Sequence, residues 1–303
     1  MAVDKLVDST QLDADLTSVA NAIRTKGGTS AQMAFPTGFV SAVNAIPQGD
    51  ENLAKLAGPS GYLSYRWAYG IFEENEEFSV DVSNYVFRSS AGANPPPMTD
   101  AFVSARCLKS IEILNYRNLF GPQSNYPAFN EFAYKTSSYG AFTDNLESVS
   151  IKIKDENGAL PYITPSSCVD TFSGRRKLKV VDVVWDMSHI AAYSAGYNFR
   201  NMFANCEALE EIRFAPNSLL WMSTSYQIFN VSQVLSDASL VSIANALAVG
   251  STAPNIKLLS TPYARCSTLM GTVTDGLFTQ DDVSGTVSLA DFIANTKGWT
   301  LST

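Results

Sequence analysis

The chain has 303 residues, of which 46% are hydrophobic and 17% are charged. This composition is typical of a globular protein and excludes a largely disordered chain. The formal net charge is −8 and no basic run occurs, so we expect no nucleic-acid binding. No stretch approaches the ~18 apolar residues of a membrane helix, and the N-terminus has no apolar signal core. We therefore expect no membrane insertion, and synthesis and assembly in the cytoplasm.

Residues 1–47 predict a module of two short amphipathic helices. The first helix ends at Gly27-Gly28, and the second begins near Pro36 and ends at Pro47. The apolar positions that recur at helical spacing include Leu12, Leu16, Val19, Ile23, Phe39 and Val43. Two short helices cannot bury a core alone. They must therefore pack on the rest of the chain, on copies of themselves or on a partner.

Residues 48–98 are interpreted as a linker followed by a β-rich connecting region. The segment FSVDVSNYVF (78–87) is rich in β-branched and aromatic residues, which favour strands. The run Asn94-Pro95-Pro96-Pro97 then interrupts the chain and marks a boundary.

A fourfold repeat follows, in segments that begin at residues 101, 141, 171 and 202. Each contains a Phe, then a Leu, and then apolar residues three and five positions after that Leu. The positions are Phe102, Phe142, Phe172 and Phe203; Leu108, Leu146, Leu178 and Leu209; and the pairs Ile111/Ile113, Val149/Ile151, Val181/Val183 and Ile212/Phe214. This L-x-x-L-x-L spacing is the strand signature of a leucine-rich repeat. One unit cannot bury its apolar side, but stacked units can, with their strands in a parallel ladder.

The repeat predicts an α+β fold. We expect a short leucine-rich-repeat solenoid over residues 99–232 and a C-terminal helical cap over residues 233–303. The Phe-to-Phe steps of 40, 30 and 31 residues exceed the usual ~20–29 for this repeat class, so insertions must loop out. Leu240, Ile243 and Leu247 recur at helical spacing and predict the helix that closes the solenoid.

Three segments also carry a resemblance to known proteins. MFANCEALEEIRFAPNSL (202–219) closely resembles the BspA-like leucine-rich repeat, with Phe203, Cys206, Leu209, Ile212 and Pro216 in matching positions. Residues 16–46 resemble an N-terminal module of bacteriophage tail, baseplate and fibre proteins. Residues 239–248 and 296–303 resemble the closing segment of phage proteins with these repeats, whereas residues 48–100 have no such counterpart. The repeats here are longer and less regular than the family consensus, which leaves their number open.

The resemblance implies a non-enzymatic structural protein of a phage particle, of the tail, baseplate or fibre type, with other virion proteins as partners. It also implies that residues 1–47 are an anchoring or oligomerisation module and that the chain forms a homo-oligomer, with a trimer favoured. A head fibre or capsid decoration protein is an alternative within that class, and a bacterial adhesin-like repeat protein is a second class. A depolymerase is disfavoured because no acid/base pair stands out. His189, with Asp186 and Ser188 beside it in sequence, does not make a catalytic triad by adjacency alone.

No cofactor or metal is expected. The four cysteines form no CxxC pair, there is one histidine, and no phosphate-binding or dinucleotide motif occurs. A binding surface is expected instead in the insertions 115–139 and 184–200. Aromatic residues there are not needed for the repeat core and suit recognition of a host polysaccharide, a host protein or a neighbouring virion subunit. The residues expected to form it are Tyr116, Tyr126, Trp185, Tyr193 and Tyr197.

Overall fold

The structure is a computed structural model with a mixed α+β fold. It describes residues 13–21, 75–81, 102, 107–115, 129, 132–133, 145–152, 162–191, 200–219, 229–249 and 255–303. The chain divides into two compact units, Met1–Glu51 and Asn52–Thr303.

In the first unit, residues 13–21 form a helix, as the apolar spacing predicts. Leu16 is half-buried on this helix, and Val19 is 49% exposed. The other four positions of the predicted module, Leu12, Ile23, Phe39 and Val43, lie outside the described residues.

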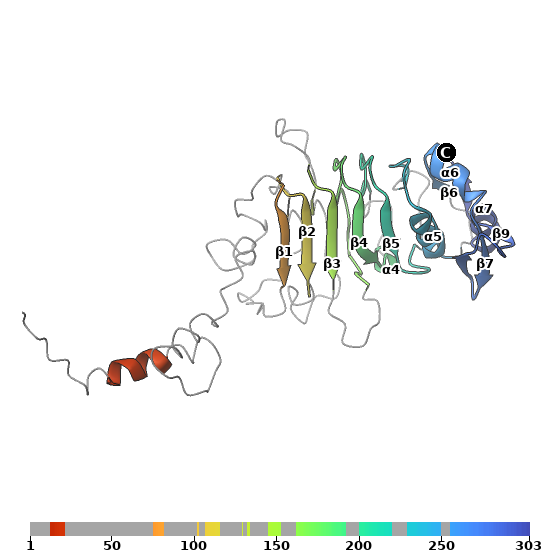
Figure 1. Cartoon of the computed structure of the whole chain (residues 1–303). Coiled ribbons are helices and arrows are strands. Elements are labelled where there is room, and N and C mark those ends of the chain that lie inside the picture. The colour runs from red at the N-terminus through yellow and green to blue at the C-terminus, as the bar shows by residue number, and fades with distance from the viewer. Residues whose placement is uncertain are drawn as a thin grey trace, which may run out of the picture. The chain divides into compact units, whose positions relative to one another are not determined.

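The second unit is built on a five-stranded parallel sheet whose strands follow one another in sequence order (Figure 1). The strands are β1 (Glu77–Asp81), β2 (Ser110–Leu114), β3 (Ser148–Lys152), β4 (Val180–Trp185) and β5 (Glu211–Phe214). All four neighbouring pairs are parallel, and the pairing of β4 with β5 is irregular between Val180 and Val184. The predicted strands and their parallel ladder are confirmed.

The buried side of the sheet consists of the apolar residues at the third and fifth positions after each repeat Leu. All eight are at most 4% exposed. Ile111 lies opposite Val149, which lies opposite Val181, so like positions stack from strand to strand. Residues on each strand alternate between the buried and the outer face, because successive side chains of a strand point to opposite sides.

The sheet begins earlier than the repeat pattern predicts. On β1, Phe78 and Val80 are buried and lie opposite Ile111 and Ile113 of β2. Among the described residues the sheet therefore starts with β1 at Glu77, inside the segment that the sequence assigns to a connecting region. The sequence around β1 has the right alternation but lacks the Phe and Leu that mark the other units.

A row of buried phenylalanines runs beneath the turns that precede the strands. Ring centroids are 5.2 Å apart for Phe102 and Phe132, 6.1 Å for Phe132 and Phe172, and 5.7 Å for Phe172 and Phe203. Phe132 thus occupies this position between Phe102 and Phe172, which corrects the sequence alignment that assigned the position to Phe142. Phe142 itself lies outside the described residues. The error arose because the extra residues of the second repeat lie between its Phe and its strand.

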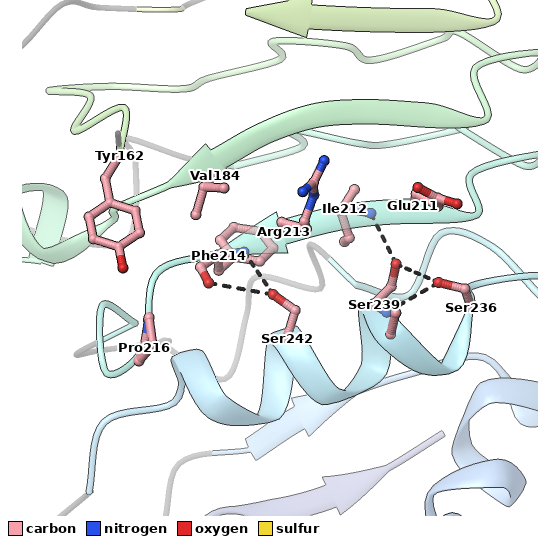
Figure 2. A pocket seen from close by; sticks show the side chains of 11 residues that line it. Tyr162, Val184, Glu211, Ile212, Arg213, Phe214, Pro216, Ser236, Ser239 and Ser242 are labelled. Atoms are coloured by element: carbon pink, nitrogen blue, oxygen red, sulfur yellow. Dashed lines mark hydrogen bonds between the residues drawn. The ribbon is translucent and has the colours of Figure 1, made fainter. Parts of the chain in front are cut away.

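Helix α5 (Asp237–Ala246) closes the edge of the sheet at β5, as predicted. Phe229 and Leu235 are both buried, and they are six residues apart, as are the Phe and the Leu of the two preceding units. After Leu235, however, helix α5 takes the place of a further strand. The Ile212 N–H donates to Ser239 Oγ at 3.0 Å, and the Phe214 N–H donates to Ser242 Oγ at 2.9 Å (Figure 2). Serine hydroxyls therefore satisfy N–H groups that a neighbouring strand would otherwise bind.

Ser239→Ala should lower the free energy of unfolding by about 1–3 kcal/mol. Ser239 is 1% exposed, and its Oγ also donates to the Glu210 carbonyl at 2.8 Å, so the substitution leaves buried backbone groups unpaired. Denaturant titration measures the change, with Ser267→Ala on the exposed end of a neighbouring helix as control. Equal stabilities of the two variants would show that the hydroxyl does not hold this edge.

The C-terminal part is not purely helical, which corrects the predicted helical cap. Besides α5 it contains two small sheets: β6 (Asn255–Lys257) with β10 (Thr300–Ser302), and β7 (Met270–Thr274) with β8 (Leu277–Gln280) and β9 (Val287–Ser288). Helices α6 (Ser260–Cys266) and α7 (Leu289–Asp291) and the π-helix η2 (Phe292–Thr296) complete it, and the short α4 (Ser188–Ala191) follows β4. The hairpin of β7 and β8 is made by Asp275 and Gly276, both at positive φ.

The segment TKGWTLST ties this C-terminal part to the main sheet and its helix. Lys297 is 1% exposed and its Nζ donates to Asn217 Oδ1 at 2.7 Å. Burial lowers the pKa of Lys297 below its usual value. The buried Trp299 donates its Nε1–H to the Ala248 carbonyl at 2.7 Å. The two hydrogen bonds join residues that are 80 and 51 positions apart in the sequence. The C-terminal segment therefore holds the C-terminal part of the chain against the end of the main sheet and the end of α5.

Candidate binding surface

The outer face of the sheet carries polar and charged side chains in register. Ser79, Glu112, Ser150 and Asp182 lie opposite one another along β1 to β4. The Lys152 ammonium lies 3.8 Å from a Glu112 carboxylate oxygen and 3.5 Å from one of Asp182, and Arg213 pairs with Asp182 from β5. These ion pairs connect four of the five strands across the outer face.

A second row of ion pairs lies where the strands begin. Lys109 contacts Glu77 at 2.7 Å, and Lys179 contacts Glu147 at 3.1 Å. The hydrogen bond to Glu77 raises the pKa of Lys109, and the hydrogen bond from Lys179 lowers the pKa of Glu147. Exposed pairs of this kind contribute little stability individually. In these pairs, positive and negative side chains lie side by side across the described strands.

A pocket lies where the outer face meets α5, with a volume of about 530 Å³. That volume is within the usual range of small-molecule sites, ~300–1,000 Å³. Figure 2 shows Tyr162 and Pro216 at one end, Glu211 and Ser236 at the other, and Arg213 between them. The other lining residues are Val184, Ile212, Phe214, Ala238, Ser239 and Ser242.

Trp185 belongs to the core, which corrects its assignment to a binding surface. It is 0% exposed, and its ring packs edge-on against Phe129 at 5.3 Å and Phe172 at 6.3 Å. The reason is its place on β4, where Val181, Val183 and Trp185 alternate onto the buried side. The other predicted binding residues, Tyr116, Tyr126, Tyr193 and Tyr197, lie outside the described residues.

The pocket residues were not predicted from the sequence. Glu211 and Arg213 were visible only as the outward positions of a predicted strand. Tyr162 stands before the isolated bridge between Ile163 and Trp185 and is 39% exposed. The signal that was available was the alternation on β5, which places Glu211 and Arg213 on the outer face, opposite the buried core.

The buried thiols of Cys168 and Cys266 are poor nucleophiles, because the thiolate is the reactive form. Burial raises the pKa of Cys266 to about 12, and it raises the pKa of Cys168 further from its usual value. In the part of the chain that the structure describes, no group of three or more His, Cys, Asp or Glu side chains is arranged to hold a metal ion. No helix among the described residues has the length and apolar character needed to cross a membrane.

No family model matches the chain, no curated protein matches it, and no solved structure matches it.

Proposed function

We propose that this chain is a non-enzymatic structural protein of a bacteriophage particle, of the tail, baseplate or fibre type. In this proposal the parallel sheet is the strand face of a short BspA-like leucine-rich-repeat solenoid. Its outer face and the adjoining pocket bind a host-surface molecule or a neighbouring subunit, and residues 1–47 attach the chain to the particle or to other copies.

The observation that carries the repeat assignment is the stacking of equivalent positions. Leu108, Leu146, Leu178 and Leu209 are all at most 2% exposed, and the turn before each of three strands buries a Phe six residues ahead of its Leu. Cys206, which matches the Cys of the family repeat, hydrogen-bonds through Sγ to the Phe172 carbonyl of the preceding unit at 3.2 Å. Contacts of this kind between neighbouring units support the proposed solenoid, because each unit of a solenoid packs on the next.

The assignment to a phage particle rests on the resemblance of residues 16–46, 239–248 and 296–303. The packing of Lys297 and Trp299 onto the end of the sheet supports the closing role that the resemblance implies for residues 296–303. A protein that displays a binding face from a particle needs a stable end to its sheet, because an open edge strand invites pairing with other chains.

Mass spectrometry of purified particles tests this proposal. We expect the full chain in the particles in a fixed ratio to the major structural proteins. A chain lacking residues 1–47 should remain soluble but be depleted from particles by at least about tenfold. Normal incorporation of the shortened chain would refute the anchoring role, and the absence of the full chain from particles would refute the virion role.

A further inference from the structure

The pocket beside α5 differs from the rest of the outer face in its mixture of surfaces. Ile212 and Phe214 of β5 contribute to its lining, but their side chains are buried on the other side of the strand, so the apolar surface open to a ligand includes the exposed side chains of Tyr162 and Pro216. At the other end lies the exposed carboxylate of Glu211. A ligand that fits this pocket must therefore offer apolar faces and hydrogen-bonding groups within a short length.

The strand beside the pocket is closed to an extended peptide. A peptide that adds to a sheet edge is held by main-chain hydrogen bonds. On β5 the N–H groups of Ile212 and Phe214 already bind Ser239 and Ser242. An added strand would have to displace these serines together with α5, which packs directly on β5.

The polar groups that remain available are those that bind hydroxyl groups. Arg213 pairs with Asp182, but its side chain is 47% exposed, and a guanidinium has five N–H donors. Glu211 can accept hydrogen bonds, and the Tyr162 ring, 39% exposed, offers both an apolar face and a hydroxyl. Sugars present apolar C–H faces bordered by hydroxyl groups, and aromatic rings with nearby charged side chains match that pattern.

We propose that this pocket binds a short segment of a surface polysaccharide, with a sugar ring stacked on Tyr162 and hydroxyl groups held by Arg213 and Glu211. The proposal names the ligand class for the binding role proposed above, and it rests on that role. Tyr162 is the anchor, because an aromatic ring supplies a large contact area at a low cost in conformational entropy.

The pocket binds the sugar without cleaving it. Most glycoside hydrolases place two carboxyl groups around the scissile bond. Among the described residues that line the pocket, Glu211 is the single carboxylate. Asp182, the carboxylate next to Arg213, is engaged in ion pairs with Arg213 and Lys152.

Binding of the full chain to an array of defined oligosaccharides tests this inference. The array carries trimers and tetramers of hexoses, deoxyhexoses, N-acetylhexosamines and uronic acids, and calorimetry measures the Kd of each saccharide that binds. We expect at least one to bind, and Tyr162→Ala to raise its Kd by about tenfold, which corresponds to about 1.4 kcal/mol. Tyr162→Phe should stay within about threefold of the wild type, because the ring remains.

Tyr263→Ala is the matched control, since Tyr263 is a comparably exposed tyrosine (36%) on α6. Its Kd should equal that of the wild type, and melting curves verify that all variants are folded. The inference is overturned if no saccharide binds at millimolar concentration, or if Tyr162→Ala and Tyr263→Ala have the same Kd for the saccharide. It is also overturned if ten-residue peptides displace the saccharide. If the protein released new reducing ends from a bound saccharide, the claim that it binds the sugar without cleaving it would be wrong. The array uses the isolated protein, so failure of the virion role would appear in the particle composition and not in these results.

Discussion

Leu209→Ala should lower the free energy of unfolding by roughly 2–5 kcal/mol. Leu209 is 0% exposed and stands at the entrance to β5, in the same core cluster as Phe203 and Ile212. Removing its side chain loses apolar contacts and leaves a cavity, which the tightly packed residues around it cannot easily fill. Denaturant titration followed by circular dichroism measures the loss, and Leu178→Ala, at the equivalent position one unit earlier, should behave in the same way.

The control for both substitutions is Val283→Ala, because Val283 is 97% exposed. Its effect should stay within about 0.5 kcal/mol. If Leu209→Ala and Val283→Ala were equally mild, Leu209 would not lie in a packed core, and the stacking of repeat units would be wrong.

Trp185→Ala should cost about 3–5 kcal/mol of stability. The side chain is fully buried against Phe129 and Phe172. Trp185→Phe should cost much less. A phenyl ring fills part of the same space, and the substitution removes the indole N–H, which finds no hydrogen-bond acceptor among the described residues. Thermal and chemical unfolding of the two variants give the comparison.

The same two variants separate a core residue from a binding residue. If Trp185→Ala kept full stability and lost ligand binding or particle adsorption, Trp185 would be exposed in solution and the sequence-based assignment would stand. We expect instead that either variant at Trp185 loses ligand binding or particle adsorption only where it also loses stability.

The strands of the sheet were predictable because their spacing follows directly from burial on one face. Ile111, Val149 and Val181 recur at a fixed distance after a Leu, and the structure places them side by side. Phe132 was missed because the distance from a turn to its strand is free to vary when extra residues loop out. β1 was missed as a member of the ladder because a single alternating strand carries no information about its neighbour.

The pocket was not predictable because it depends on a contact between two elements. Glu211 and Arg213 belong to β5, Ser236 and Ser242 lie at or on α5, and Tyr162 comes from a segment about 50 residues earlier. Ion pairs such as Lys152 with Glu112 and Asp182 likewise join residues 30 or more positions apart. The assignment of Trp185 failed for a related reason: the predicted insertion began at residue 184, whereas β4 continues through Trp185.

Electron microscopy of purified particles labelled with an antibody against the C-terminal part of the chain tests the proposed virion role most directly. The account predicts label at one fixed place on each particle, in a number that follows the local symmetry. Label on the tail, baseplate or its fibres agrees with the favoured assignment, and label on the head selects the head fibre or decoration alternative. Particles without label, with the antigen confined to the soluble fraction or to the bacterial surface, would contradict the account.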